Sequence, residues 1–169
     1  MNIIIEKMQS QEDRDFVISL NQKEVDVLSP MDFEKLALFE KIADVFWIIK
    51  IDENPAAFLI AIRENASYLN ENYAFFQEKY ARFLYIDRIV IDEPYRKIGL
   101  GKAIYKALKE FALNNGVSTI TAEVDIEPVY NNASLRFHAN QGFYEVGTQW
   151  VRGKSVKVSL LVWNAGENQ

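Results

Sequence analysis

Two glycines in the short basic stretch Arg96–Gly101 could hold a phosphate group. The stretch lies where an apolar strand pattern, residues 83–91, ends and a helical pattern, residues 102–115, begins. Because glycine has no Cβ, a ligand can approach the backbone of this loop closely. The unpaired N–H groups and positive dipole end of the following helix favour a bound anion. The loop therefore predicts a pyrophosphate site, although two glycines between a strand and a helix can also form a plain turn.

A second stretch, Asn131–Phe143, follows about thirty residues after the loop. Together the two stretches resemble the acyl-CoA-binding halves of the GNAT superfamily of N-acetyltransferases. The first motif of that superfamily reads Arg/Gln-x-x-Gly-x-Gly/Ala, and the second reads approximately Asn-x-x-Ser-x-x-Phe-His/Tyr-x-x-x-Gly-Phe. The resemblance runs from Tyr85 to Phe143 and loosely to the C-terminus, and residues 85–90 with 123–125 are similar to a bacterial branch of the superfamily.

The resemblance implies acetyl-CoA as the co-substrate and no metal. Backbone N–H groups of the loop would bind the pyrophosphate, and the strand edge at residues 89–91 would bind the pantetheine arm like an added strand. An amide of that edge would also face the thioester oxygen. Asn131 and Ser134 would hold the arm from the other side, although each could equally cap a helix. The predicted donor-binding residues are Ile89, Val90, Ile91, Arg96, Lys97, Ile98, Gly99, Leu100, Gly101, Lys102, Asn131, Ser134 and His138.

Three side chains are candidates for proton transfer. His138, the single histidine, stands where many GNAT enzymes carry a tyrosine thought to protonate the departing thiolate, and the imidazole pKa suits that step. Contact with the donor or simple packing are its alternative roles. Asp87 is the first candidate for the base that deprotonates the amine, and Glu123 is the second. Each carboxylate could instead form a salt bridge, for Asp87 with the neighbouring Arg88.

Composition limits the alternatives. A chain of 169 residues that is 49% hydrophobic can bury one core, and we expect a single domain, residues 1–169. Without cysteine there can be no disulfide, no thiolate metal site and no cysteine nucleophile. A net charge of −5 argues against nucleic acid as a partner. We find no pattern of a signal peptide or membrane span, so that the expected location is the cytoplasm.

The order of patterns predicts a mixed α/β fold of the GNAT type, in which a central, mostly antiparallel twisted sheet is flanked by helices. Ser10 is predicted to cap a first helix with Asp13 at its third position, and Ser29-Pro30 to begin a second. Two hairpins are expected, one around residues 52–55 and one around Arg152-Gly153. The long connection 64–81 is rich in aromatic residues and predicts either a lid over the acceptor pocket or a helix packed on the sheet.

The leading hypothesis is an enzyme that transfers an acetyl group from acetyl-CoA to a primary amine by direct attack. A small amine, an antibiotic, an amino acid or a protein amine all remain open as acceptors, and so does a homodimer. The alternative is a non-catalytic acyl-CoA-binding module or sensor. A dinucleotide-binding domain fits less well, because the third glycine of its fingerprint and the repeated βαβ units are missing.

Overall fold

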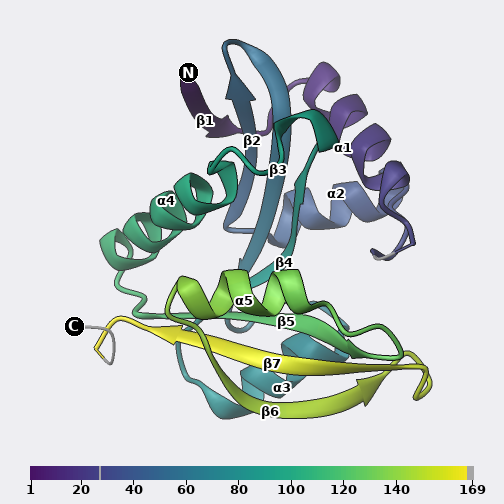
Figure 1. Cartoon of the computed structure of the whole chain (residues 1–169), viewed down its shortest axis with the longest axis vertical. Helices are drawn as coiled ribbons and strands as arrows, with labels where there is room; N and C mark the ends of the chain where they lie inside the picture. The colour runs from purple at the N-terminus through teal and green to yellow at the C-terminus, as the bar shows by residue number, and fades with distance from the viewer. Residues whose placement is uncertain (27, 167–169) are drawn as a thin grey trace. The chain divides into compact units, whose positions relative to one another are not determined.

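The computed structural model describes residues 1–26 and 28–166 and has a mixed α/β fold (Figure 1). Its strands follow the hydrogen-bonded order β1-β2-β3-β4-β5-β7-β6. The strands are β1 Ile3–Lys7, β2 Val45–Ile51, β3 Asn54–Arg63, β4 Leu84–Ile91, β5 Thr119–Glu127, β6 Tyr144–Val151 and β7 Val156–Asn164. The helices are α1 Gln11–Lys23, α2 Phe33–Ile42, α3 Glu71–Lys79, the 3₁₀ turn η1 Glu93–Tyr95, α4 Leu100–Asn114 and α5 Asn132–Asn140.

Antiparallel pairing dominates the sheet. The pairs β1–β2, β2–β3, β5–β7 and β6–β7 are antiparallel. One pair is parallel, in which Leu84 and Tyr85 of β4 lie opposite Ile120 and Thr121 of β5. The predicted fold class, a mixed and mostly antiparallel sheet with flanking helices, is therefore confirmed.

The contacts of the chain group into two compact units. Unit 1 contains residues 1–62 and 86–104, and unit 2 contains residues 63–85 and 105–169. Neither unit is continuous in sequence, and both β4 and α4 contribute residues to each of them. The expected single domain, residues 1–169, stays a prediction.

The two N-terminal helices begin differently from one another. At α1 the predicted capping box is present, because the Ser10 side chain accepts a hydrogen bond from the Asp13 N–H and Asp13 accepts one from the N–H of Ser10. The predicted start of the second helix at Ser29-Pro30 is wrong, since Asp32 caps α2 by accepting from the Lys35 N–H. The hydroxyl of Ser29 instead accepts from the buried Arg88, a partner that lies far away in the sequence.

The first hairpin turns through Asp52 and Glu53, which both have positive φ values, 48° and 71°. Such a pair matches the right-handed twist of the strands on either side and makes a tight connection. The predicted hairpin is present, and its two strands bury almost every side chain from Val45 to Ile62 outside the turn. This hairpin is the main part of the core of unit 1.

In unit 2 the long connection contains the helix α3, with Asn70 as its N-cap. Tyr73 and Phe76 of this helix are buried and pack against Phe83 and Tyr85, with ring centroids 5.6–6.4 Å apart. The Tyr73 hydroxyl also donates to the carbonyl of Arg63. Of the two alternatives for residues 64–81, packing of a helix on the sheet therefore describes these aromatic residues.

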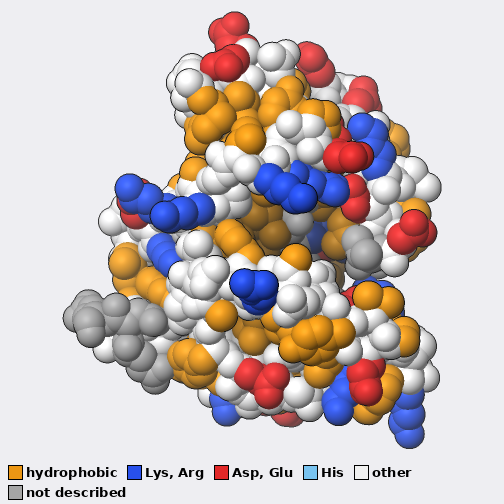
Figure 2. All heavy atoms as spheres, viewed as in Figure 1, with side chains coloured by type: hydrophobic (Ala, Val, Ile, Leu, Met, Phe, Trp, Pro, Cys, Tyr) orange, Lys and Arg blue, Asp and Glu red, His pale blue; other side chains and the backbone are white. Residues whose placement is uncertain are grey.

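Glycines follow the ends of α4 and α5. Gly116 and Gly142 have φ values of +73° and +92°, and the residue after each donates back to a carbonyl of the last helical turn. In Figure 1, α5 runs along β5 and β7. On the face drawn in Figure 2, acidic and basic side chains are interspersed among hydrophobic ones. Within the described residues, no helix has both the length and the apolar character needed to cross a membrane.

Candidate functional site

The predicted phosphate loop lies in unit 1, between β4 and α4. Asp92 caps η1, and the N–H of Arg96 closes that turn on the carbonyl of Glu93. Lys97 and Gly99 then take positive φ values of 64° and 86°. A Cβ at Gly99 would meet nothing within 4 Å, so that conformation rather than lack of space favours glycine there.

α4 begins directly after this turn, at Leu100, and its first turn of N–H groups has no acceptor within the helix. Residues 96–99 are exposed, whereas Leu100 is buried and anchors the start of the helix. A left-handed residue followed by a helix N-terminus presents several N–H groups to one point, as anion-binding nests do. The loop therefore has the backbone geometry to receive a phosphate group.

The basic side chains of the loop are not equivalent. Arg96 donates from Nε to the carbonyl of Ile91 at 2.9 Å and from Nη2 to the carboxylate of Glu24, the C-cap residue of α1. Lys97 and Lys102 are exposed, and neither forms an ion pair within the part of the chain that the structure describes. The lysines are thus free to meet an anion, while Arg96 would first have to leave Glu24.

The strand edge predicted to hold the pantetheine arm is the end of β4. Ile89 and Ile91 are half-buried and alternate with Val90, which is buried. This alternation is the one that the strand period predicts. After Ile91 the chain leaves the strand, and the N–H of Asp92 donates to the carbonyl of Ala56 in β3.

Asp87 and Arg88, in the middle of β4, form an ion pair with 2.8 Å between Asp87 Oδ2 and Arg88 Nε. Both side chains are at least 96% buried. Arg88 Nη1 donates to Asn21 Oδ1 and to the Ser29 carbonyl, and Nη2 donates to the Ser29 hydroxyl. The guanidinium also lies 5.3 Å from the ring centroid of Phe39. The salt bridge with Arg88, which was the alternative role predicted for Asp87, is present. The role of Asp87 as a base stays a prediction.

The remaining predicted residues belong to unit 2. Glu123 is half-buried on β5, and its Oε1 accepts from the Tyr85 hydroxyl at 2.9 Å. Asn131 is the N-cap of α5, where its Oδ1 accepts from the Ser134 N–H. Asn131 therefore does act as a helix cap, the alternative that the sequence left open.

His138 is buried on α5 among aromatic rings. Nδ1 lies 2.8 Å from the carbonyl oxygen of Ser134, and Nε2 lies 2.7 Å from the hydroxyl of Tyr105 on α4. Burial lowers the pKa of His138, and the bond to the Ser134 carbonyl opposes that change. Burial, with the charge of Glu123 acting in the same direction, raises the pKa of Tyr105 well above its ordinary value.

Sequence reasoning did not predict Tyr105. The buried face of α4 consists of Leu100, Ile104, Tyr105, Leu108 and Ala112, so that one hydroxyl lies among its apolar side chains. Tyr105 lies three residues before Leu108 and seven before Ala112, so helical spacing indicates its place on that face from the sequence alone. The partner network of Arg88 gave no such signal, since Asn21 and Ser29 are far from it in sequence.

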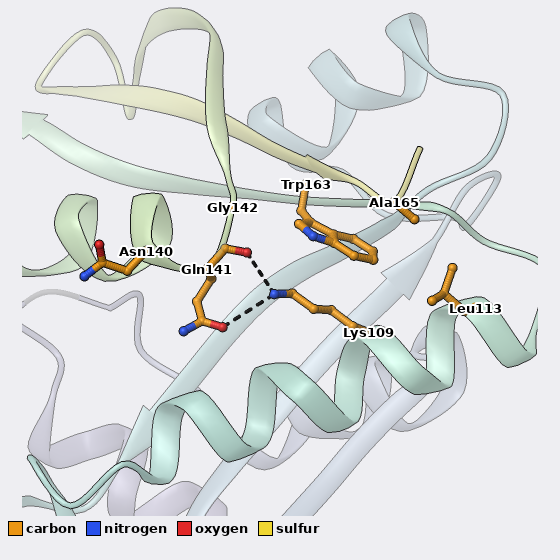
Figure 3. Close-up of a pocket in the computed structure, with 7 residues that line it drawn as sticks. All are labelled: Lys109, Leu113, Asn140, Gln141, Gly142, Trp163 and Ala165. Atoms are coloured by element: carbon orange, nitrogen blue, oxygen red, sulfur yellow. Dashed lines mark hydrogen bonds between the residues drawn. The ribbon is translucent and has the colours of Figure 1, made fainter. Parts of the chain in front are cut away.

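Unit 2 also has a shallow pocket of about 430 Å³, drawn in Figure 3. Lys109 projects into it from α4, and its ammonium donates to the backbone carbonyl of Gln141 at 2.8 Å and lies 5.3 Å from the Trp163 ring. Burial lowers the pKa of Lys109. The remaining lining residues are Leu113, Asn140, Gly142 and Ala165. None of the residues predicted to carry the chemistry lines this pocket.

The chain matches the Acetyltransferase (GNAT) family over residues 5–143. This protein therefore belongs to the GNAT family, as its two motifs predict.

Among curated proteins, tyramine N-feruloyltransferase 4/11 of Nicotiana tabacum is 32% identical over 93 residues. That match covers 52% of this chain and 39% of the tobacco protein, so the chain spans well under half the length of this relative.

Two solved structures illustrate the likeness of the fold. The ribosomal-protein-S18-alanine N-acetyltransferase of Escherichia coli has a TM-score of 0.72 at 16% identity, with 97% of this chain and 94% of the other covered. Naa50 of Arabidopsis thaliana, in complex with the bisubstrate analogue CoA-Ac-MVNAL, has a TM-score of 0.71 at 13% identity, with 96% and 98% covered. At these identities the likeness establishes the fold.

Proposed function

We propose that this protein is an N-acetyltransferase that transfers an acetyl group from acetyl-CoA to a primary amine by direct attack. The observation that carries the proposal is the loop 96–102, in which a left-handed Gly99 leads into the N-terminus of α4 beside two exposed lysines. That geometry suits a pyrophosphate, and it occurs in a chain of the GNAT family. Acetyl-CoA would supply the thioester.

The residues proposed to bind acetyl-CoA follow from the loop and the two motifs. The N–H groups of residues 96–102 would bind the pyrophosphate, with Lys97 and Lys102 as its charged partners. The backbone of Ile89–Ile91 would bind the pantetheine arm, and Ser134 with Asn131 would contact it as the second motif implies. The tobacco relative is named as a feruloyltransferase, so the identity of the acyl group is the first part of the proposal to test.

In the proposed reaction the amine nitrogen bonds to the acyl carbon, the carbon–sulfur bond breaks and the thiolate leaves. The amine must lose a proton, because an ammonium ion has no lone pair with which to attack. Asp87 and Glu123 are the proposed acceptors of that proton, directly or through water. The thiolate must gain a proton, and His138 is the proposed residue on that side of the reaction.

A non-catalytic acyl-CoA-binding module is the second candidate. It is favoured by the fact that Asp87 and His138 are both engaged by protein groups, Arg88 for the one and Tyr105 with Ser134 for the other. A module of this kind would bind the donor and transfer nothing.

An assay for thiol release distinguishes the two functions. Protein is incubated with acetyl-CoA or feruloyl-CoA and one amine at a time, including tyramine, a lysine derivative and short peptides with a free N-terminus. Amine-dependent release of CoA, with the acylated amine identified by mass spectrometry, is the expected result. Donor binding without release for any amine would contradict transferase activity and favour the module, while reactions without amine measure simple hydrolysis.

A further inference from the structure

The hydrogen bonds of His138 determine which of its nitrogens carries the proton. A carbonyl oxygen can only accept, so that the 2.8 Å contact with the Ser134 carbonyl requires the hydrogen on Nδ1. In a neutral imidazole Nε2 is then the acceptor. The Tyr105 hydroxyl, 2.7 Å from Nε2, is accordingly the donor of that bond.

The rings around the pair fix it in an apolar setting. Phe137 and Phe143 stand edge-on against Tyr105, with centroids 5.0 and 5.8 Å away, and against His138 at 5.5 and 5.2 Å. Tyr105 is 1% exposed and His138 is 6% exposed. Water therefore has little access to either hydrogen-bonding group, and a broken Tyr105–His138 bond would leave both partners unsatisfied.

The charged and titratable groups around the imidazole are few. The Ser134 hydroxyl of α5 lies 3.4 Å from Nδ1 and is neutral. Glu123 of β5 acts on Tyr105 through its charge. Among the residues that the structure describes, no carboxylate forms a hydrogen bond with the imidazole, and a buried imidazole without such a partner favours its neutral form.

We propose that Tyr105 is a positioning residue that holds His138 as the neutral Nδ1–H tautomer, with Nε2 kept as a hydrogen-bond acceptor. The tautomer follows from these contacts alone. Its effect on turnover rests on the proposed function: while Tyr105 occupies Nε2, the imidazole has no Nε2 proton to donate. Any protonation of a leaving thiolate by His138 would first require this bond to change.

The single histidine of the chain makes the proposal directly measurable. In ¹⁵N-labelled protein, a two-bond ¹H–¹⁵N correlation spectrum reports the protonation state of each imidazole nitrogen separately, and only one imidazole contributes. The expected spectrum at pH 7 has a protonated Nδ1 and an unprotonated Nε2. A spectrum of the Nε2–H tautomer, or of a charged imidazole, would overturn the proposal without any variant.

Tyr105→Phe removes the hydroxyl and keeps the ring that packs against Phe137 and Phe143. Because the lost donor stabilises the neutral imidazole, the pKa of His138 should rise by about 0.5 to 1 in this variant. Tyr73→Phe is the matched control, since its hydroxyl also lies in unit 2 and bonds to Arg63 and Ala66 rather than to His138. An unchanged tautomer and pKa in a folded Tyr105→Phe protein would overturn the inference.

Turnover gives a separate readout. If His138 is the acid of the reaction, the alkaline limb of the pH profile of kcat should move to higher pH in Tyr105→Phe with the pKa of His138, and Tyr73→Phe should leave that limb in place. A merely structural role for Tyr105 would lower activity at every pH without moving that limb. Failure of the proposed function would appear as no turnover in any protein, with the NMR result unaffected.

Discussion

Arg88 and Arg96 lie eight residues apart in unit 1, and the side chain of each donates hydrogen bonds to a residue in or after α1. Arg88 is 6% exposed and directs its three nitrogens to Asp87, Asn21 and Ser29. The Arg96 side chain is 43% exposed, and its partner Glu24 is 25% exposed. A buried ion pair is strongly destabilising to break, whereas an exposed pair is worth little and can exchange partners. The region of Arg88 is thus a fixed support, and the region of Arg96 is open to a ligand.

The largest effect is expected from the buried region. Arg88→Ala removes the buried ion pair with Asp87 and the hydrogen bonds to Asn21 and Ser29, which should lower the free energy of unfolding by about 3–5 kcal/mol. Denaturant unfolding of the wild type and the variant measures it. Arg88→Lys keeps the charge without the planar fork and should lie between the two. A decrease of less than about 1 kcal/mol in the free energy of unfolding would mean that the buried pair of Arg88 contributes no more to stability than an exposed pair does.

A smaller effect is expected from the free lysines of the exposed region. Lys102→Gln removes a charge beside the predicted pyrophosphate and should weaken acetyl-CoA binding about fivefold, which corresponds to about 1 kcal/mol. Lys106→Gln makes the same change at an exposed position one turn further along α4 and serves as the control. Equal affinities of the two variants would place the donor away from this end of the helix.

The smallest effect is expected from Glu24. Glu24→Gln releases Arg96 for the anion, so that acetyl-CoA should bind about twofold to fivefold more tightly, while stability changes by less than about 1 kcal/mol. Lys23→Gln breaks the neighbouring ion pair with Asp92 and leaves Arg96 in place. The affinity of this variant for acetyl-CoA should therefore match that of the wild type. Weaker binding in Glu24→Gln would show that Glu24 holds Arg96 in its working position rather than competing for it.

Much of the fold could be predicted because its signals are local. The Ser10–Asp13 capping box, the glycines that end α4 and α5, and the hairpin at Asp52-Glu53 depend on neighbouring residues alone. The start of α2 could not be predicted in this way, because Arg88, from a strand about sixty residues away, takes the hydroxyl of Ser29 that a local reading assigns to a cap. Tertiary contacts outweighed the local preference there.

The same distinction applies to the candidate site. The loop 96–102 could be identified from sequence because its function lies in backbone geometry, which glycine positions reveal. The state of His138 could not, because the second motif shows neither the Tyr105 hydroxyl nor the carbonyl that orients the ring. Side-chain chemistry depends on partners brought in by the fold, and so the roles of Asp87, Glu123 and His138 remain predictions that need their own variants.

The proposed function requires that the loop before α4 binds the pyrophosphate of an acyl-CoA. Calorimetric titration with acetyl-CoA of the wild type, Gly101→Glu and Asn114→Glu tests it most directly. The two variants add the same charge to opposite ends of α4, and circular dichroism checks that both fold. We expect saturable binding by the wild type and Asn114→Glu, and at least about tenfold weaker binding by Gly101→Glu. No binding of any CoA species by the wild type, or equal binding by all three proteins, would contradict it.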